Sequence, residues 1–397
     1  MSEEIKNLQE ELNDQMQIRR DKLAEYEADG IYPFGQRFVV KDHAKDIKND
    51  FLNYEDQPVV IAGRLMTMRS HGKTAFANIR DLSGDIQVYF RKDVLGEDNY
   101  KYVKMLDIGD IVGLEGHVFR THSGEVTIKV DKLTLLSKAL RPLPEKWHGL
   151  KDTELRYRQR YVDLIVNPEV RDTFIKRSKI VAKIREYMMN DGFMEVETPM
   201  MHPIPGGAAA RPFITHHNAL DIDIYMRIAP ELYLKRLIVG GMERVFEMNR
   251  CFRNEGIDNR HNPEFTTIES YQAYGDVEDA IRLTENLVSY CAQEVLGTQE
   301  ITYQGTEINL TPPWNRITMA EGVKKYTGED FDAVTTVEEA RAIADRLNVE
   351  YTDNDGIGKI LNACFEDYVE ENLIQPTIVY GHPKEISPLA KASRENP

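Results

Sequence analysis

The sequence predicts an α+β protein of several domains, in which an N-terminal helix and an all-β module precede a larger domain of helices and antiparallel strands. Length is the first reason, because 397 residues with 41% hydrophobic content can bury two or more separate cores. The second is a set of five extended runs between residues 57 and 140. The third is a long amphipathic helical pattern after residue 165, which leads into further extended runs.

Residues 1–56 are predicted to form an N-terminal helical extension. Apolar residues recur there at roughly helical spacing, and the pattern stops before Pro33. Arg19, Arg20 and Lys22 belong to this helix. Two interpretations of these charges remain open: contact with an RNA backbone, or a solvated helix face.

Residues 57–140 are predicted to be all-β. Short turn sequences separate five extended runs, and a short helical piece lies between the third and the fourth. This order is the plan of an OB-fold, a barrel that often binds single-stranded nucleic acid, although another small barrel or a sandwich also fits the periodicity. The module holds 12 basic and 10 acidic residues on a chain of net charge −16, so it stands out as the part suited to contact phosphate.

A basic connector at 141–165 contains two prolines and a glycine, and it marks the boundary to the larger domain, residues 166–397. This domain opens with an amphipathic helix at 169–192 and an extended run that ends at Pro199. Helical patterns and one strand near the C-terminus predict an insertion at about 313–375.

Composition argues against disulfides, a zinc site, a membrane helix and a secretory signal. Three widely spaced cysteines, with no CxxC pair, favour neither a disulfide framework nor a zinc site. No run approaches the ~20 apolar residues of a membrane helix. The N-terminus has neither the basic start nor the apolar core of a secretory signal, so we expect a cytoplasmic protein.

The segment 245–274 carries the most informative side chains. Two extended runs flank the loop 253–263, whose Gly, Asn and Pro residues favour turns, so a long hairpin is predicted. A guanidinium such as Arg253 makes bidentate bonds to phosphate or carboxylate, and His261 can neutralise phosphates. Phe265 can stack on a base. A surface hairpin with solvated charges is the plain alternative.

A glycine pair and a glutamate at a helix start are weaker indications of a ligand site. Gly206 and Gly207 would let the backbone approach a ligand closely, or they form a plain turn. Glu231 begins a predicted helix, where a carboxylate can pair with a substrate ammonium or simply complement the helix dipole.

The segment 252–274 resembles the second signature motif of the class II aminoacyl-tRNA synthetases, in the form found in bacterial-type lysyl-tRNA synthetases. Residues 252–255 match the FRxE tetrad of the class, and the RHNPEF run at 260–265 narrows the resemblance to the lysyl branch. Aspartyl and asparaginyl enzymes resemble it less closely. The resemblance extends along the whole chain, and it makes an OB-fold that grips the anticodon the expected form of residues 57–140.

The resemblance implies ATP-dependent activation of lysine to lysyl-adenylate and transfer of lysine to the 3′ end of tRNA(Lys), with Mg²⁺ as the metal. Arg253 is the implied catalytic residue. The implied ATP-binding residues are Arg253, Glu255, His261, Asn262 and Phe265. The implied lysine-binding residues are Gly207, Glu231, Glu269 and Tyr271. The implied anticodon-binding residues are Arg69, Phe76, Gln87 and Glu125.

Three expectations complete the resemblance. The helix, strand and proline at 169–199 resemble the first class II motif, which implies a homodimer. The third motif and the family's magnesium-binding acids would lie beyond Pro397, so we expect an incomplete catalytic domain whose activity depends on the remaining part. The alternatives are a non-catalytic tRNA-binding or regulatory relative, and aspartyl or asparaginyl specificity in the same fold.

Overall fold

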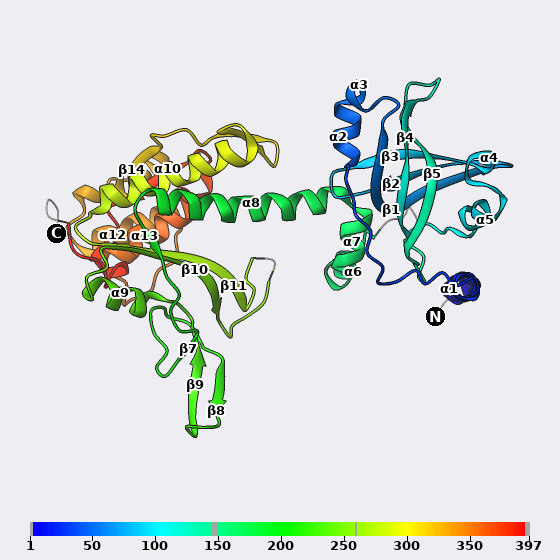
Figure 1. Ribbon diagram of the computed structural model, residues 1–397. Helices are drawn as coiled ribbons and strands as arrows, with labels where there is room; N and C mark the ends of the chain where they lie inside the picture. The colour runs from blue at the N-terminus through cyan, green and yellow to red at the C-terminus, as the bar shows by residue number, and fades with distance from the viewer. Residues whose placement is uncertain (1–2, 145–149, 259, 394–397) are drawn as a thin grey trace. The chain divides into compact units, whose positions relative to one another are not determined.

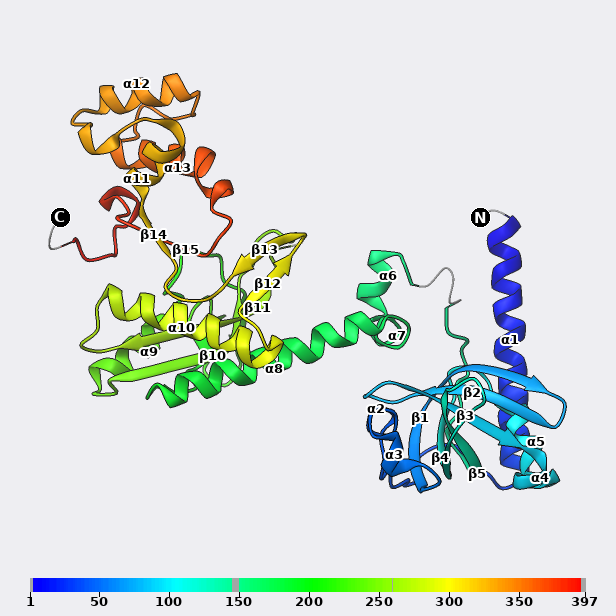
Figure 2. The same cartoon turned by 90° about the horizontal axis from the view of Figure 1, so that it is seen from above.

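The chain folds into two compact units, residues 1–171 and 172–397. Figures 1 and 2 show the elements of each unit from two directions. The computed structural model describes side chains from residue 13 onward, and its described ranges are 3–144, 150–258 and 260–393. A barrel in the first unit and antiparallel sheets with helices in the second confirm the predicted fold class.

Five strands close into a barrel in the order β1-β2-β3-β5-β4. They are β1 (Pro58–His71), β2 (Thr74–Arg80), β3 (Asp85–Arg91), β4 (Ile111–Arg120) and β5 (Val126–Ser137). Buried and half-buried residues alternate along β2 and β3, because successive side chains of a strand point to opposite faces. The predicted helix after the third strand is present as α4 (Lys92–Leu95) and α5 (Glu97–Met105). The predicted barrel is therefore confirmed, and the alternative of a sandwich is wrong.

The N-terminal helix α1 (Glu3–Ala28) is held to the first unit by polar groups. Arg19 is buried, and its Nη1 donates at 2.9 to 3.2 Å to the carbonyls of Ile108, Ala139 and Arg141. Lys22 pairs with Asp107 at 2.7 Å. Two of the three charges left open by the sequence thus serve the fold, while Arg20 is exposed.

A buried ion cluster joins the segment before β4 to the segment after β5. The ammonium of Lys138, fully buried, lies 2.5 Å from the carboxylate of Asp107 and 2.8 Å from that of Asp110. Asp110 also accepts from the backbone N–H groups of Asp107 and Ala139. Because Lys22 binds Asp107 as well, two ammonium groups compensate two carboxylates, as burial of charge requires.

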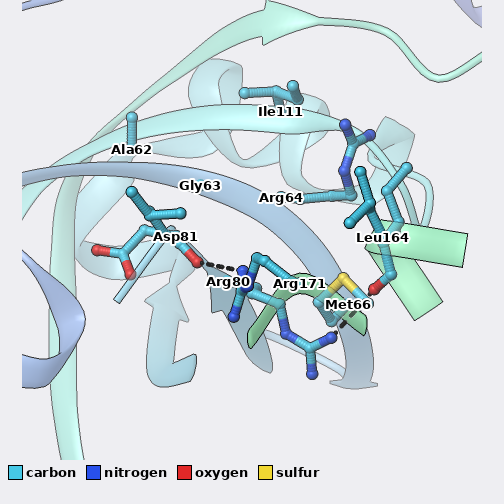
Figure 3. A pocket seen from close by; sticks show the side chains of 11 residues that line it. Ala62, Gly63, Arg64, Met66, Arg80, Asp81, Ile111, Leu164 and Arg171 are labelled. Carbon is cyan, nitrogen blue, oxygen red and sulfur yellow. Dashed lines mark hydrogen bonds between the residues drawn. The ribbon is translucent and has the colours of Figure 1, made fainter. Parts of the chain in front are cut away.

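Short helices flank the barrel: α2 (Ala44–Asn49), α3 (Phe51–Tyr54), α6 (Thr153–Arg158) and α7 (Arg160–Val166). A surface cavity of about 360 Å³ is lined by barrel strands and by α7. Figure 3 shows side chains that line it. At its edge Arg80 donates to the carbonyl of Ile165 at 3.1 Å, and Arg171 donates to the carbonyl of Asp81 at 3.0 Å. The first bond fastens the end of the connector to β2, and the second fastens the start of α8 (Pro168–Asn190) to the β2–β3 turn. Part of the predicted connector, residues 145–149, lies outside the described residues.

The second unit contains the long hairpin predicted from the sequence. It is formed by β10 (Arg244–Phe252) and β11 (Glu264–Gln272), with the short β6 (Met194–Glu195) in parallel on the other side of β10. The helices α8 (Pro168–Asn190) and α10 (Val277–Leu296) contribute side chains to a core with this sheet. Phe246 of β10 is fully buried in that core. β6 covers only two residues of the extended run expected up to Pro199.

A second sheet of the same unit has the order β7-β9-β8 and leads into α9. These elements are β7 (Met201–His202), β8 (Ile214–His217), β9 (Ile222–Met226) and α9 (Glu231–Val239). Toward the C-terminus follow the hairpin β12 (Glu300–Tyr303) and β13 (Thr306–Asn309), and the parallel pair β14 (Asn315–Thr318) and β15 (Thr377–Tyr380).

The helices predicted for the insertion are present and have their own core. They are α11 (Met319–Thr327), α12 (Val337–Leu347) and α13 (Ile357–Tyr368). Val323, Ala340 and Cys364 are fully buried among them. Burial raises the pKa of the Cys364 thiol to about 11. Cys251 is buried and Cys291 half-buried, and all three cysteines are free. Within the described ranges, no helix is long and apolar enough to cross a membrane.

Replacing the buried Lys138 by methionine tests the ion cluster of the first unit. Lys138→Met leaves Asp110 without a counter-ion in a buried site, and we expect this to cost about 3–5 kcal/mol of stability. Differential scanning calorimetry of the whole chain measures the loss. The matched control is Lys132→Met, which removes an exposed pair with Glu115 and should leave the unfolding transition unchanged. Equal melting of the two variants would contradict the cluster's role.

Candidate functional site

The β10–β11 hairpin sets the positions of most predicted site residues. Cys251 faces Phe265 across the two strands, and Glu247 faces Glu269. The backbone N–H of Arg253 donates to the carbonyl of Pro263 at 2.9 Å and closes the base of the loop. Side chains two residues apart on a strand share a face, so the register brings residues from the two strands together in pairs.

Arg253 and Phe265 form one unit at the base of this loop. The guanidinium carbon of Arg253 lies 5.1 Å from the centre of the Phe265 ring, a cation–π contact that holds the side chain in place. The Nε of Arg253 is buried, and it makes no hydrogen bond to any residue that the structure describes. An arginine held by an aromatic ring, with its Nε donor unpaired among the described residues, is well prepared for an anionic ligand.

Carboxylates gather on the neighbouring part of the hairpin. Glu269 is half-buried and accepts a hydrogen bond from the Tyr271 hydroxyl at 3.1 Å. Burial raises the pKa of Glu269, the hydrogen bond from Tyr271 opposes the rise, and the charges of Glu231 and Glu247 add to it. Burial, and then the charge of Glu269, raises the pKa of the Tyr271 phenol. The charges of neighbouring carboxylates therefore act on Glu269 in a partly buried environment.

A buried ion pair lies behind these carboxylates. Arg227, at the end of β9, binds Glu247 of β10 at 2.6 Å, and both side chains are almost fully buried. Its Nε donates to the carbonyl of Arg250 at 2.8 Å, and the Thr198 hydroxyl donates to the second oxygen of Glu247 at 2.6 Å. Glu247 is thus neutralised within the fold, so Glu269, which has no cationic partner among the described residues, is the carboxylate left for a cationic ligand.

The glycine loop lies against the start of α9. Gly207 has a φ of +89°, and a Cβ there would come within 3.0 Å of the Cβ of Glu231. A Cβ on Gly206 would meet a methyl group of Leu232 at 2.7 Å. The positive φ favours glycine at position 207, whereas at position 206 the exposed end of the Leu232 side chain could shift. The loop brings Gly207 next to Glu231 as one wall of the carboxylate cluster. The carboxylate of Glu231 pairs with Lys235 at 2.5 Å.

The remaining predicted ATP-binding residues lie on the exposed loop and bond locally. His261 pairs with Asp258 at 2.7 Å, and the amide of Asn262 donates to the carbonyl of Glu264. Glu255 accepts from the backbone N–H of Arg211 at 3.3 Å. Among the described residues, no hydrogen bond links His261 or Asn262 to Arg253. The neighbouring Asn259 lies outside the described residues.

The outer face of the barrel carries the predicted anticodon residues in two adjacent rows. Strand pairing aligns Arg69, Phe76 and Tyr89 in one row. The next row contains Gln87 and, on β5, Thr127. The fourth predicted residue, Glu125, directly precedes β5 and pairs with Lys48 at 3.2 Å.

Phe76 is part of an aromatic group and not an isolated ring. It stacks on Tyr89 with ring centres 4.3 Å apart, and Tyr89 contacts Phe119 with ring centres 6.2 Å apart. One face of Phe76 is therefore covered by protein. Tyr89 and Phe119 were missed from the sequence, although alternation along β3 and β4 places both on the outer face.

The described residues do not fit a resident metal. No group of three or more His, Cys, Asp or Glu side chains among them could hold a metal ion. Glu231 and Glu247 of the carboxylate cluster are paired with Lys235 and Arg227.

Comparison with known proteins agrees with this geometry. Residues 59–136 match a family described as an OB-fold nucleic acid binding domain, and residues 152–397 match the tRNA synthetases class II (D, K and N). A lysine–tRNA ligase of Thermoanaerobacter pseudethanolicus is 57% identical over 100% of this chain and 80% of that protein. One of Bacillus subtilis is 55% identical over 100% of this chain and 81% of its own length. The chain belongs to the class II tRNA synthetases of the D, K and N group.

Proposed function

We propose that this chain is a lysine–tRNA ligase, which activates lysine with ATP and transfers it to tRNA(Lys). The observation that carries the proposal is the carboxylate cluster of Glu231 and Glu269 beside Gly207. Lysine brings two ammonium groups to such a cluster, whereas aspartate and asparagine bring one and aspartate adds a negative side chain. The names of the relatives, which are 55–57% identical, support the same choice.

The reaction needs positioning and charge neutralisation, and no side-chain nucleophile. The lysine carboxylate attacks the α-phosphorus of ATP, pyrophosphate leaves, and a ribose hydroxyl at the tRNA 3′ end then attacks the acyl carbon and displaces AMP. Arg253 bridges the carboxylate and the α-phosphate, so that the attacking and accepting atoms are held together while negative charge builds on the phosphate oxygens. Preorganisation by Phe265 lowers the entropy lost when Arg253 binds.

The other predicted residues surround these two groups. Glu255 accepts from the adenine amino group, and the face of Phe265 that Arg253 leaves open stacks on the adenine ring. His261 and Asn262 hold the outer phosphates once the loop closes over ATP. The carbonyl of Gly207 accepts from the α-amino group of lysine, and Tyr271 contacts its side chain beside Glu269 and Glu231.

On the barrel, an unpaired anticodon base stacks on Phe76, while Arg69, Gln87 and Glu125 bond to base edges. The stack of Phe76 on Tyr89 supports a platform that is rigid before RNA binds.

We further propose that the chain works in the cytoplasm as a homodimer through α8 and β6, and that Mg²⁺ accompanies ATP as an ion of the substrate.

ATP–pyrophosphate exchange with lysine, aspartate or asparagine tests the function. The chain spans about 80% of the length of these relatives, so the assay compares it with a chain extended to their full length. Exchange that depends on lysine alone is expected. Exchange that depends on aspartate or asparagine would assign the chain to another member of the group, and tRNA binding without exchange in the extended protein would favour a non-catalytic relative.

Arg253→Ala tests the catalytic assignment. In the extended protein this change should abolish exchange, because the α-phosphate loses its positioned cation, while tRNA affinity stays unchanged. Arg250→Ala is the control, since Arg250 lies near the end of β10, three residues before Arg253, but pairs with the exposed Glu264. Exchange retained by Arg253→Ala would remove this residue from its role.

The raised pKa of Glu269 predicts how lysine binding changes with pH. Below that pKa the carboxyl is neutral and no longer attracts an ammonium. Lysine affinity should therefore fall as the pH decreases, and the fall should begin at a higher pH than for a glutamate with the ordinary pKa of 4.5. Titration calorimetry with lysine from neutral to mildly acidic pH measures the effect. Glu269→Gln should bind weakly without this pH dependence, whereas the exposed control Glu264→Gln should behave as the parent chain.

Phe76→Ala tests the anticodon platform. Loss of one stacked base should weaken tRNA(Lys) binding by ~1–3 kcal/mol, measured by filter binding, while lysine binding is unaffected. Phe34→Ala removes an exposed aromatic ring elsewhere in the first unit and serves as the control. Equal affinities of the two variants would exclude Phe76 as the platform.

A further inference from the structure

Thr127 makes a hydrogen bond that bears directly on how Gln87 can read a base. Thr127 is fully buried, and its hydroxyl lies 2.7 Å from the Oε1 of Gln87. The two residues are register partners on β5 and β3. Gln87 and Tyr89 are two residues apart on β3, so the amide lies beside the aromatic group that would hold a stacked base.

The single proton of the Thr127 hydroxyl has two acceptors within reach. The second is the carbonyl of Glu125 at 3.2 Å, which already accepts from the backbone N–H of Thr121 at 3.0 Å. The Gln87 oxygen is closer, so the proton goes to Gln87. The oxygen of this amide is thereby occupied, while its NH₂ group has no hydrogen-bond partner among the described residues.

We propose that Thr127 is a positioning residue that makes Gln87 a hydrogen-bond donor to the anticodon, so that this position selects a base with a carbonyl oxygen. The inference rests on the proposed function. Uracil presents a carbonyl at position 4 where cytosine presents an amino group. A fixed NH₂ group therefore bonds to uridine and meets the amino group of cytidine donor to donor.

Selectivity in this arrangement comes from the buried partner. A free glutamine rotates its amide by half a turn and presents either a donor or an acceptor, so it accepts both pyrimidines. Thr127 removes that freedom without touching the RNA itself. The Thr127–Gln87 bond therefore adds little to the affinity for the correct tRNA. Its main effect is to weaken the binding of a tRNA with cytidine at this position.

Binding of full-length tRNA(Lys) transcripts to the whole chain tests this inference. Each anticodon uridine is replaced by cytidine, one at a time, and affinities are measured by filter binding for the parent chain, Gln87→Ala and Thr127→Val. We expect the parent to prefer uridine at one position and Gln87→Ala to lose that preference. Thr127→Val should reduce the preference roughly three- to tenfold with little change in affinity for the uridine tRNA.

Three further variants separate positioning from damage to the barrel. Thr127→Ser keeps the hydroxyl and should restore the preference, and Thr127→Ala removes the hydroxyl without the bulk of valine and should repeat its effect. Thr134→Val makes the same change further along β5, where the side chain has no bond to Gln87, and it should change nothing.

The same binding measurements separate the role of Thr127 from the existence of the anticodon site. If Thr127→Val and Thr127→Ala both keep the full preference for uridine over cytidine while Gln87→Ala loses it, Thr127 has no positioning role, and the reading of the anticodon by Gln87 stands. A Gln87-dependent preference for cytidine also overturns the role of Thr127, because that requires the amide oxygen to face the base. If Gln87→Ala and Phe76→Ala both bind every transcript like the parent, the anticodon site itself is wrong.

Discussion

The buried ion pair between Arg227 and Glu247 is the constraint on which the candidate active site depends. It joins the end of β9 to the middle of β10, and Thr198 adds the segment before β7 to the same cluster. A buried charge is tolerated only with a partner at close range, so these segments cannot move apart without a large cost in free energy. The pair also decides which carboxylates remain available, because it occupies Glu247 and leaves Glu269 without a cationic partner among the described residues.

The barrel uses the alternation of its strands for two separate purposes. Inward side chains form an apolar core that includes Val88 and Phe90, and outward side chains of the same strand include Gln87 and Tyr89. Recognition residues can thus differ without disturbing the core. The exception is Thr127, a buried polar residue whose hydroxyl reaches the outer face, and this coupling of interior to surface makes it informative.

Local patterns in the sequence were sufficient for much of the architecture. The helix at 169–192, the hairpin around residues 253–263 and the helices after residue 313 all follow from periodicity and turn residues, because these act over neighbouring positions. Arg253 and Phe265, which the motif indicated separately, contact each other in the structure. Tyr89 and Phe119 were missed, since an outward aromatic residue is recognisable as a platform only when strand pairing places it beside another ring.

The sequence by itself determined the order of elements, the five strands of the first unit and the residue types of the proposed nucleotide-binding motif. Only the tertiary structure decided how charges are compensated. Lys138 with Asp110, and Arg227 with Glu247, are 28 and 20 residues apart, and each pair is buried. Sequence patterns report local preferences, whereas the partner of a buried charge depends on which distant strands pack together, and no local spacing encodes that.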